Sequence, residues 1–126
     1  MSAISRRGFV IATLLVTAAT LAFSQDGRYG RARDLVNRVQ KNLRHAERFT
    51  PPNEKEKERY HNAQQHLSEF DRKLSEGRFD KDKLDEAIDD VKNVVEHNTL
   101  AAESRDALSR DLQELRDLRR ARGESY

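Results

Sequence analysis

Apolar residues recur at steps of three and four positions along most of the chain between residues 32 and 118. Such spacing places side chains on one face of an α-helix, whereas a half-buried strand needs strict alternation, which no segment shows over a useful length. The pattern therefore predicts an all-α protein. Because 37% of the residues are charged, against about 25% in an average domain, we expect its core to be thin.

Three breaks divide the helical pattern into four segments. Pro51 and Pro52 lack a backbone N–H and end the first segment. Gly77 ends the second in the left-handed conformation that glycine adopts readily, and Asn98-Thr99 separates the third from the fourth. The helices are predicted at about residues 30–49, 53–76, 80–97 and 99–122.

Several helix starts carry capping residues. Asn53 and Asp80 are predicted N-caps, and Thr99 is expected to recap the chain before the fourth helix. Phe79 precedes the Asp80 cap and is expected to pack on Leu84 as a hydrophobic staple.

Short connections make successive helices antiparallel neighbours, so the sequence predicts one domain, residues 25–126, built as an antiparallel up-down four-helix bundle. The second choice is a three-helix bundle whose first helix is detached or exchanged between subunits. Because a thin core buries little apolar surface, a homo-oligomer that buries more is a further alternative. The central packing is assigned to Leu67, Phe70, Leu74, Leu84, Val91, Leu108, Leu112 and Leu115.

The aromatic residues Phe49, Tyr60, Phe70 and Phe79 are interpreted as the largest members of this core. An exposed member would instead contribute to an apolar patch suited to a partner or an unfolded client.

Residues 1–24 have the composition of a cleavable secretory signal peptide. Arg6 and Arg7 precede an apolar run, and the small residues Ala22 and Ser24 predict cleavage after Ser24. The apolar run of residues 8–23 is shorter than the roughly 20 residues of a spanning helix. We therefore favour cleavage over retention as a membrane anchor, and expect the protein in the periplasm or outside the cell.

The segment SRRGF at residues 5–9 resembles the core motif of twin-arginine signal peptides. Val10 and Ile11 stand where leucine and lysine are often found in that motif. The resemblance implies export of an already folded protein, and the ordinary Sec route is the alternative.

Charge is balanced overall but unevenly distributed. Residues 25–126 contain 22 basic and 22 acidic residues, so the net basic charge typical of a nucleic-acid binder is absent and no nucleic-acid partner is expected. Residues 25–50 nevertheless carry a net charge of +4, and residues 77–97 a net charge of −3.

The basic first helix is the candidate binding face. One interpretation is that its charges and those of the acidic third helix lie on solvated faces that attract each other weakly across the bundle. The other is that the basic face meets anionic lipid, cell-wall polymer or an acidic partner. The residues assigned to this face are Arg31, Arg38, Lys41, Arg44 and Arg48.

The residues that carry catalysis are largely missing. The sequence has no cysteine, its only methionine is Met1, and it has neither a glycine-rich phosphate loop nor a nucleophile elbow. We therefore predict a protein that is not an enzyme, with no catalytic residue, no cofactor and no metal.

The histidines do not alter this expectation. Glu58 and His61 match one Glu-x-x-His half-motif of di-iron bundles, but such a centre needs two, and helical periodicity turns both side chains toward water. His45 and His97 are also expected to face outward, whereas His66 flanks the core as a hydrogen-bonded boundary residue.

The sequence thus favours an exported, non-enzymatic protein that acts by binding another macromolecule, as an adaptor, stress-response or chaperone-like factor. Small exported helical chaperones are similar in size, but their Leu-Thr-x-x-Gln repeats are absent, so that family is not assigned. The alternative is a metal- or cofactor-binding helical bundle.

Overall fold

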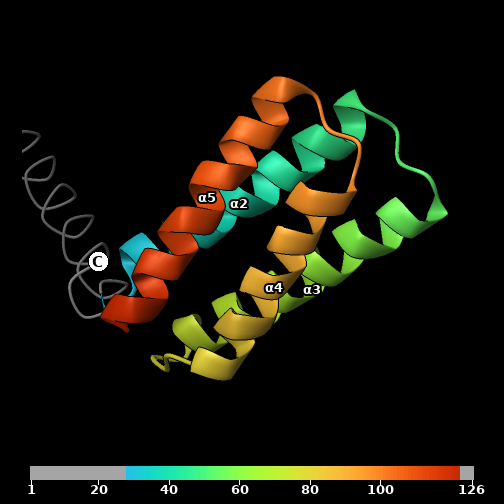
Figure 1. The fold of residues 1–126 in the computed structure, drawn as a ribbon. Helices are drawn as coiled ribbons and strands as arrows, with labels where there is room; N and C mark the ends of the chain where they lie inside the picture. Colours follow the sequence, from blue (N-terminus) through green and yellow to red (C-terminus); the bar gives the residue numbers. More distant parts are fainter. Residues whose placement is uncertain (1–27, 123–126) are drawn as a thin grey trace, which may run out of the picture.

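The computed structural model describes residues 28–122, so the predicted signal peptide lies outside the described residues. Four helices follow one another in this range, and no strand is found among residues 28–122 (Figure 1). The prediction of an all-α protein is confirmed. The helices are α2 (Gly30–Phe49), α3 (Glu54–Ser75), α4 (Lys81–His97) and α5 (Ala102–Ala121). Among these helices, none combines the length and apolar character needed to cross a bilayer.

The helices run alternately up and down, as Figure 1 shows. Each packs against the next along the chain, and α5 returns to pack against α2, which closes the bundle. Within the described helices, α2 and α4 are diagonal to each other and do not pack together. The four-helix bundle is confirmed, and the second choice with a detached first helix is not the arrangement found, because α2 packs on both α3 and α5.

The predicted helix caps of α3 and α4 are confirmed. The Asn53 side chain accepts from the Glu56 N–H at 2.9 Å, and the Glu56 carboxylate accepts from the Asn53 N–H at 3.0 Å, a reciprocal capping box. The Asp80 side chain accepts from the Lys83 N–H at 3.1 Å. Gly77 follows α3 with φ of +80°, the left-handed conformation that favours glycine.

The start of α5 differs from the sequence-based prediction, since the helix begins at Ala102 rather than at Thr99. The Thr99 N–H donates to the Glu56 carboxylate, and the Asn98 side chain donates to the Glu56 carbonyl oxygen at 3.2 Å. Arg59 Nη1 also donates to the Asn98 side chain at 3.0 Å. These bonds tie the loop to the first turns of α3, so Thr99 does not act as a cap. Ala101 occupies the N-cap position without a side-chain hydrogen bond.

The apolar stripes of all four helices meet in one core. Every residue assigned to the central packing is buried. Tyr60 is buried as well, and the partly buried ring of Phe79 packs edge-on against Phe70 with centroids 5.5 Å apart. The prediction of a core Phe49 is wrong, because this residue is 66% exposed. Phe49 is the last residue of α2 and lies about 90° from the centre of the buried stripe.

Candidate functional site

Ion pairs divide the basic residues of α2 into two groups. Arg33 forms a two-point pair with Asp71 of α3, at 3.0 and 3.3 Å. Arg38 Nε lies 3.3 Å from Asp111 Oδ1 of α5, and its guanidinium also pairs with Glu114. These two arginines therefore link α2 to its neighbours. Arg38, which the sequence assigned to the binding face, has a structural role.

Asp111 is the residue that gives Arg38 this role. Its side chain is 4% exposed, and it accepts a second hydrogen bond from Asn42 Nδ2 at 2.6 Å. A buried carboxylate is costly unless it is paired, so Asp111 depends on Arg38 and Asn42. Asp111 was not among the residues predicted from the sequence. A signal was present, because Asp111 stands three residues after Leu108 and four before Leu115, on the buried face of the helix.

The second group comprises the exposed bases Arg31, Lys41, Arg44 and Arg48, none of which forms an ion pair within residues 28–122. Helical periodicity places Arg31 on the flank that it shares with Arg38. Lys41, Arg44 and Arg48 lie on the side of α2 opposite its buried stripe.

Phe49 lies on the flank of α2 beside this basic surface, and its ring stacks with that of His45 at a centroid distance of 6.1 Å. Both side chains are exposed. The surface made by these two aromatic rings and the three outward bases is called the α2 outer face below. Its members are Lys41, Arg44, His45, Arg48 and Phe49.

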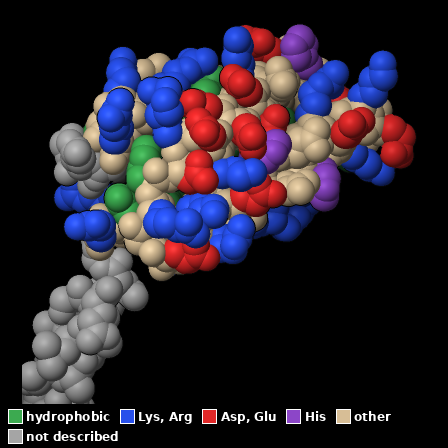
Figure 2. All heavy atoms as spheres, turned by 90° about the horizontal axis from the view of Figure 1, so that it is seen from below, with side chains coloured by type: hydrophobic (Ala, Val, Ile, Leu, Met, Phe, Trp, Pro, Cys, Tyr) green, Lys and Arg blue, Asp and Glu red, His purple; other side chains and the backbone are tan. Residues whose placement is uncertain are grey.

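The acidic residues of α4 do not neutralise the α2 outer face. The exposed Asp82, Asp89 and Glu96 lie on the outer side of α4, and α4 is diagonal to α2 among the described helices. Asp85 instead pairs with Arg119 of α5 at 2.7 Å, and this ion pair lowers the pKa of its carboxyl. On the face seen in Figure 2, basic and acidic side chains are interspersed, with little hydrophobic surface between them.

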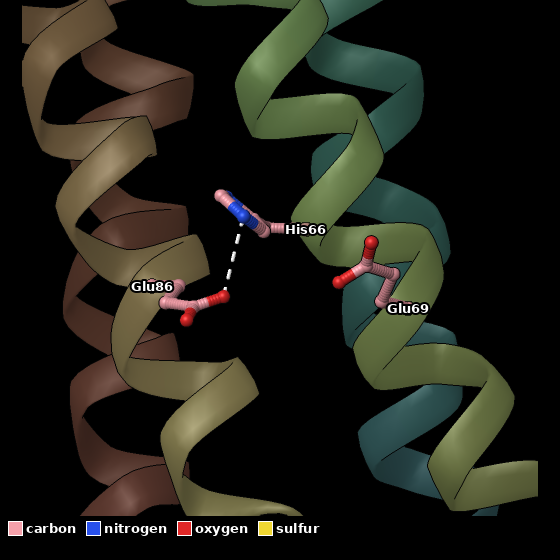
Figure 3. A group of neighbouring side chains, drawn as sticks. All are labelled: His66, Glu69 and Glu86. Carbon is pink, nitrogen blue, oxygen red and sulfur yellow. Dashed lines mark ion pairs between the residues drawn. The ribbon is translucent and has the colours of Figure 1, made fainter.

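A second polar feature joins α3 to α4. His66 and Glu69 project from α3 toward Glu86 of α4, as Figure 3 shows. One donor atom from each of the three side chains lies within 4.8 Å of the other two. His66 Nε2 is 3.2 Å from Glu86 Oε2, and His66 Nδ1 contacts the Asp90 carboxylate. The name α3–α4 cluster is used below for His66, Glu69, Lys83, Glu86 and Asp90.

Lys83 supplies a positive charge to this cluster. Its ammonium nitrogen lies 2.8 Å from Glu69 Oε2 and 3.6 Å from Glu86 Oε2. The hydrogen bond between Lys83 and Glu69 lowers the pKa of the Glu69 carboxyl and raises the pKa of Lys83. Both groups are therefore charged at neutral pH. The carboxylates of the cluster were not predicted as a group, because they come from two different helices.

The histidine positions agree with the helical periodicity. His66 is a partly buried, hydrogen-bonded boundary residue, as predicted. His45, His61 and His97 are exposed, and so is Glu58. The Glu58–His61 pair therefore faces away from the core, as expected.

Comparison with known proteins does not indicate a function for this chain. No protein-family model matches this chain, and no curated protein or solved structure shows significant similarity to it. Two features remain as candidates: the α2 outer face, which offers charge to a partner, and the α3–α4 cluster, which gathers metal-ligating side chains.

Proposed function

We propose that this chain is an exported, non-enzymatic protein that binds an acidic protein partner through the α2 outer face. One observation carries the proposal. Lys41, Arg44 and Arg48 share the outward side of α2 without an ion pair among residues 28–122, while the acidic helix α4 lies diagonally across the bundle. The positive charge of this surface is therefore available to a partner.

The spacing of the three bases suits a linear acidic segment. They stand at positions i, i+3 and i+7, so they extend over about 10 Å of the helix axis. Phe49 adds an apolar contact on the neighbouring flank, and this residue is 66% exposed. Arginine and aromatic side chains are enriched among the residues that dominate binding energy at protein interfaces.

Other anionic partners fit less well. A helix that lies on a lipid surface inserts its apolar face into the membrane, whereas the apolar face of α2 is buried in the bundle. A polyanion such as nucleic acid is attracted by a net basic protein, and residues 25–126 carry no net charge. An acidic protein segment requires only a local basic surface.

The place of action proposed is the periplasm or the outside of the cell. Support comes from residues 1–24, with the arginine pair, the short apolar run and the small residues before Gln25. A role as adaptor, stress-response or chaperone-like factor is compatible with a small helical bundle that presents one binding helix.

A titration followed by NMR tests the binding proposal. The probe is a glutamate-rich peptide containing one leucine, added to ¹⁵N-labelled protein at low ionic strength. We expect shift changes confined to the α2 outer face, and their loss in a Lys41→Glu, Arg44→Glu, Arg48→Glu variant. Lys55→Glu, Lys92→Glu and Arg116→Glu together change the net charge equally at exposed positions on the other three helices, and should leave binding intact.

Three outcomes would overturn the proposal. The first is the absence of shift changes on α2, and the second is equal loss of binding in both triple variants. The third is tighter binding to vesicles containing anionic phosphatidylglycerol than to the peptide, which would point to a membrane partner instead.

A further inference from the structure

The α3–α4 cluster places an imidazole nitrogen of His66 against a carboxylate oxygen of Glu86. His66 Nδ1 lies against the Asp90 carboxylate, which can only accept a hydrogen bond, so the Nδ1 atom carries the ring proton. In a neutral imidazole the other nitrogen, Nε2, then has a lone pair and no hydrogen. This atom faces Glu86 Oε2 at 3.2 Å. Two acceptors at this distance repel each other unless a cation or a second ring proton lies between them.

We propose that His66, Glu69 and Glu86 bind a divalent cation of the zinc class, with Asp90 orienting the imidazole. Zinc takes histidine nitrogen and carboxylate oxygen at about 2.0–2.2 Å, usually in a tetrahedron. The edge of such a tetrahedron is about 3.3 Å, close to the Nε2–Oε2 distance found here. Glu69 supplies the third donor, within 4.8 Å of the other two.

The surroundings of the three donors fit this role. Asp90 provides the carboxylate–histidine contact that commonly fixes the tautomer of a metal-bound histidine. The Asp90 side chain is 18% exposed, so the orienting contact is shielded, whereas the Glu86 side chain is 47% exposed. The cluster is therefore open to solvent on the Glu86 side, which gives an ion a path to enter and leaves the fourth position to water.

Lys83 acts as an internal competitor for the same carboxylates. Its ammonium nitrogen is 2.8 Å from Glu69 Oε2 and 3.6 Å from Glu86 Oε2, so it satisfies both groups when no metal is bound. Zinc must displace this contact, and Lys83 lowers the affinity of the site accordingly. Removal of the Lys83 charge should therefore strengthen metal binding, an effect opposite to that of removing a ligand.

A metal site was not expected from the sequence, which does not indicate that Glu86 faces His66. The metal site is independent of the proposed binding function. The α2 outer face and the α3–α4 cluster share no residue, so the failure of one proposal leaves the other unaffected.

Isothermal titration with zinc chloride at pH 7.5 tests the site on the purified protein. We expect one zinc per chain, with affinity reduced about 10–100-fold in Asp90→Asn, the range seen when an orienting partner is removed. His66→Gln removes a ligand and should lower the affinity at least as much. His61→Gln is the matched control, since His61 is an exposed histidine on the same helix, and its affinity should equal that of the wild type. Lys83→Gln should bind zinc more tightly than the wild type.

Circular dichroism of each variant separates loss of binding from loss of folding, and Lys83→Gln adds a gain that unfolding cannot produce. The proposal is overturned if the wild-type protein binds no stoichiometric zinc, or if His66→Gln and His61→Gln bind it equally. Unchanged or weaker zinc binding in Lys83→Gln would also contradict the assignment of His66, Glu69 and Glu86 as ligands.

Discussion

Arg38 and Asp111 pair across the interface of α2 and α5, with Nε 3.3 Å from Oδ1. This ion pair distinguishes Arg38 from Lys41 and Arg44, although all three are basic residues of the same helix with exposed side chains. The Asp111 side chain is nearly fully buried, so Arg38 serves the fold, while the other two remain available to a partner.

Charge reversal at these positions should therefore have different effects on stability. Arg38→Glu brings a third carboxylate beside Asp111 and Glu114 and should lower the free energy of unfolding by about 1–3 kcal/mol. Lys41→Glu, at an exposed position without an ion pair, should change it by less than about 0.5 kcal/mol. Urea denaturation followed by circular dichroism measures both. Equal midpoints for the two variants would show that the Arg38–Asp111 pair contributes nothing to stability.

Glu56 should make part of the stability depend on pH. Hydrogen bonds from the Asn53 N–H, and then from the Thr99 N–H, lower the pKa of the Glu56 carboxyl below its ordinary value of 4.5. A carboxyl with a lowered pKa in the folded state stabilises it above pH 4.5, and this contribution is lost as the pH falls through the folded-state pKa.

Thermal melts of the wild type and of Glu56→Gln between pH 7 and pH 3 measure this effect. The wild type should melt higher at pH 7, and the difference should shrink as the pH falls below 4.5. Other carboxyls with lowered pKa values, those of Glu69, Glu76 and Asp85, are present in both proteins, so the difference isolates Glu56. A difference in melting temperature that stays constant with pH would refute the assignment.

Cleavage of the predicted signal peptide should leave a mature chain of defined mass. If residues 1–24 are a cleaved signal peptide, intact-mass analysis of the envelope fraction should show a chain that begins at or near Gln25. Replacement of Arg6 and Arg7 together by lysine should block export by the twin-arginine route and leave Sec export nearly unchanged. Recovery of the full-length chain firmly bound to the membrane would favour an anchor over a cleaved signal.

Most of the fold could be predicted because it depends on local signals. The apolar spacing, the Asn53 and Asp80 caps and Gly77 act within a few residues of their own helix, and each was found where the sequence placed it. The start of α5 was misplaced because it is set by Glu56, 43 residues before Thr99. No local pattern reports such a contact.

The candidate sites were predicted less completely for the same reason. Helical periodicity identifies the outward side of α2. It does not indicate that Arg38 forms an ion pair with Asp111 of α5. Likewise, the position of His66 at the boundary was predictable, whereas its contacts with Glu86 and Asp90 depend on the register between α3 and α4. Phe49 was misjudged because it follows the helical spacing only approximately, at the last residue of α2.

Site-specific photocrosslinking in the native host tests binding through the α2 outer face most directly. A photoreactive residue is introduced at Arg44 and, as the matched control, at the exposed Lys92 of the diagonal helix α4. We expect a crosslinked protein from position 44, attached through an acid-rich segment, that disappears when Lys41 and Arg48 are both changed to glutamate. Position 92 should not yield this product. Identical products from the two positions, or a product from position 44 that survives the charge reversal, would show that the partner does not bind through the α2 outer face.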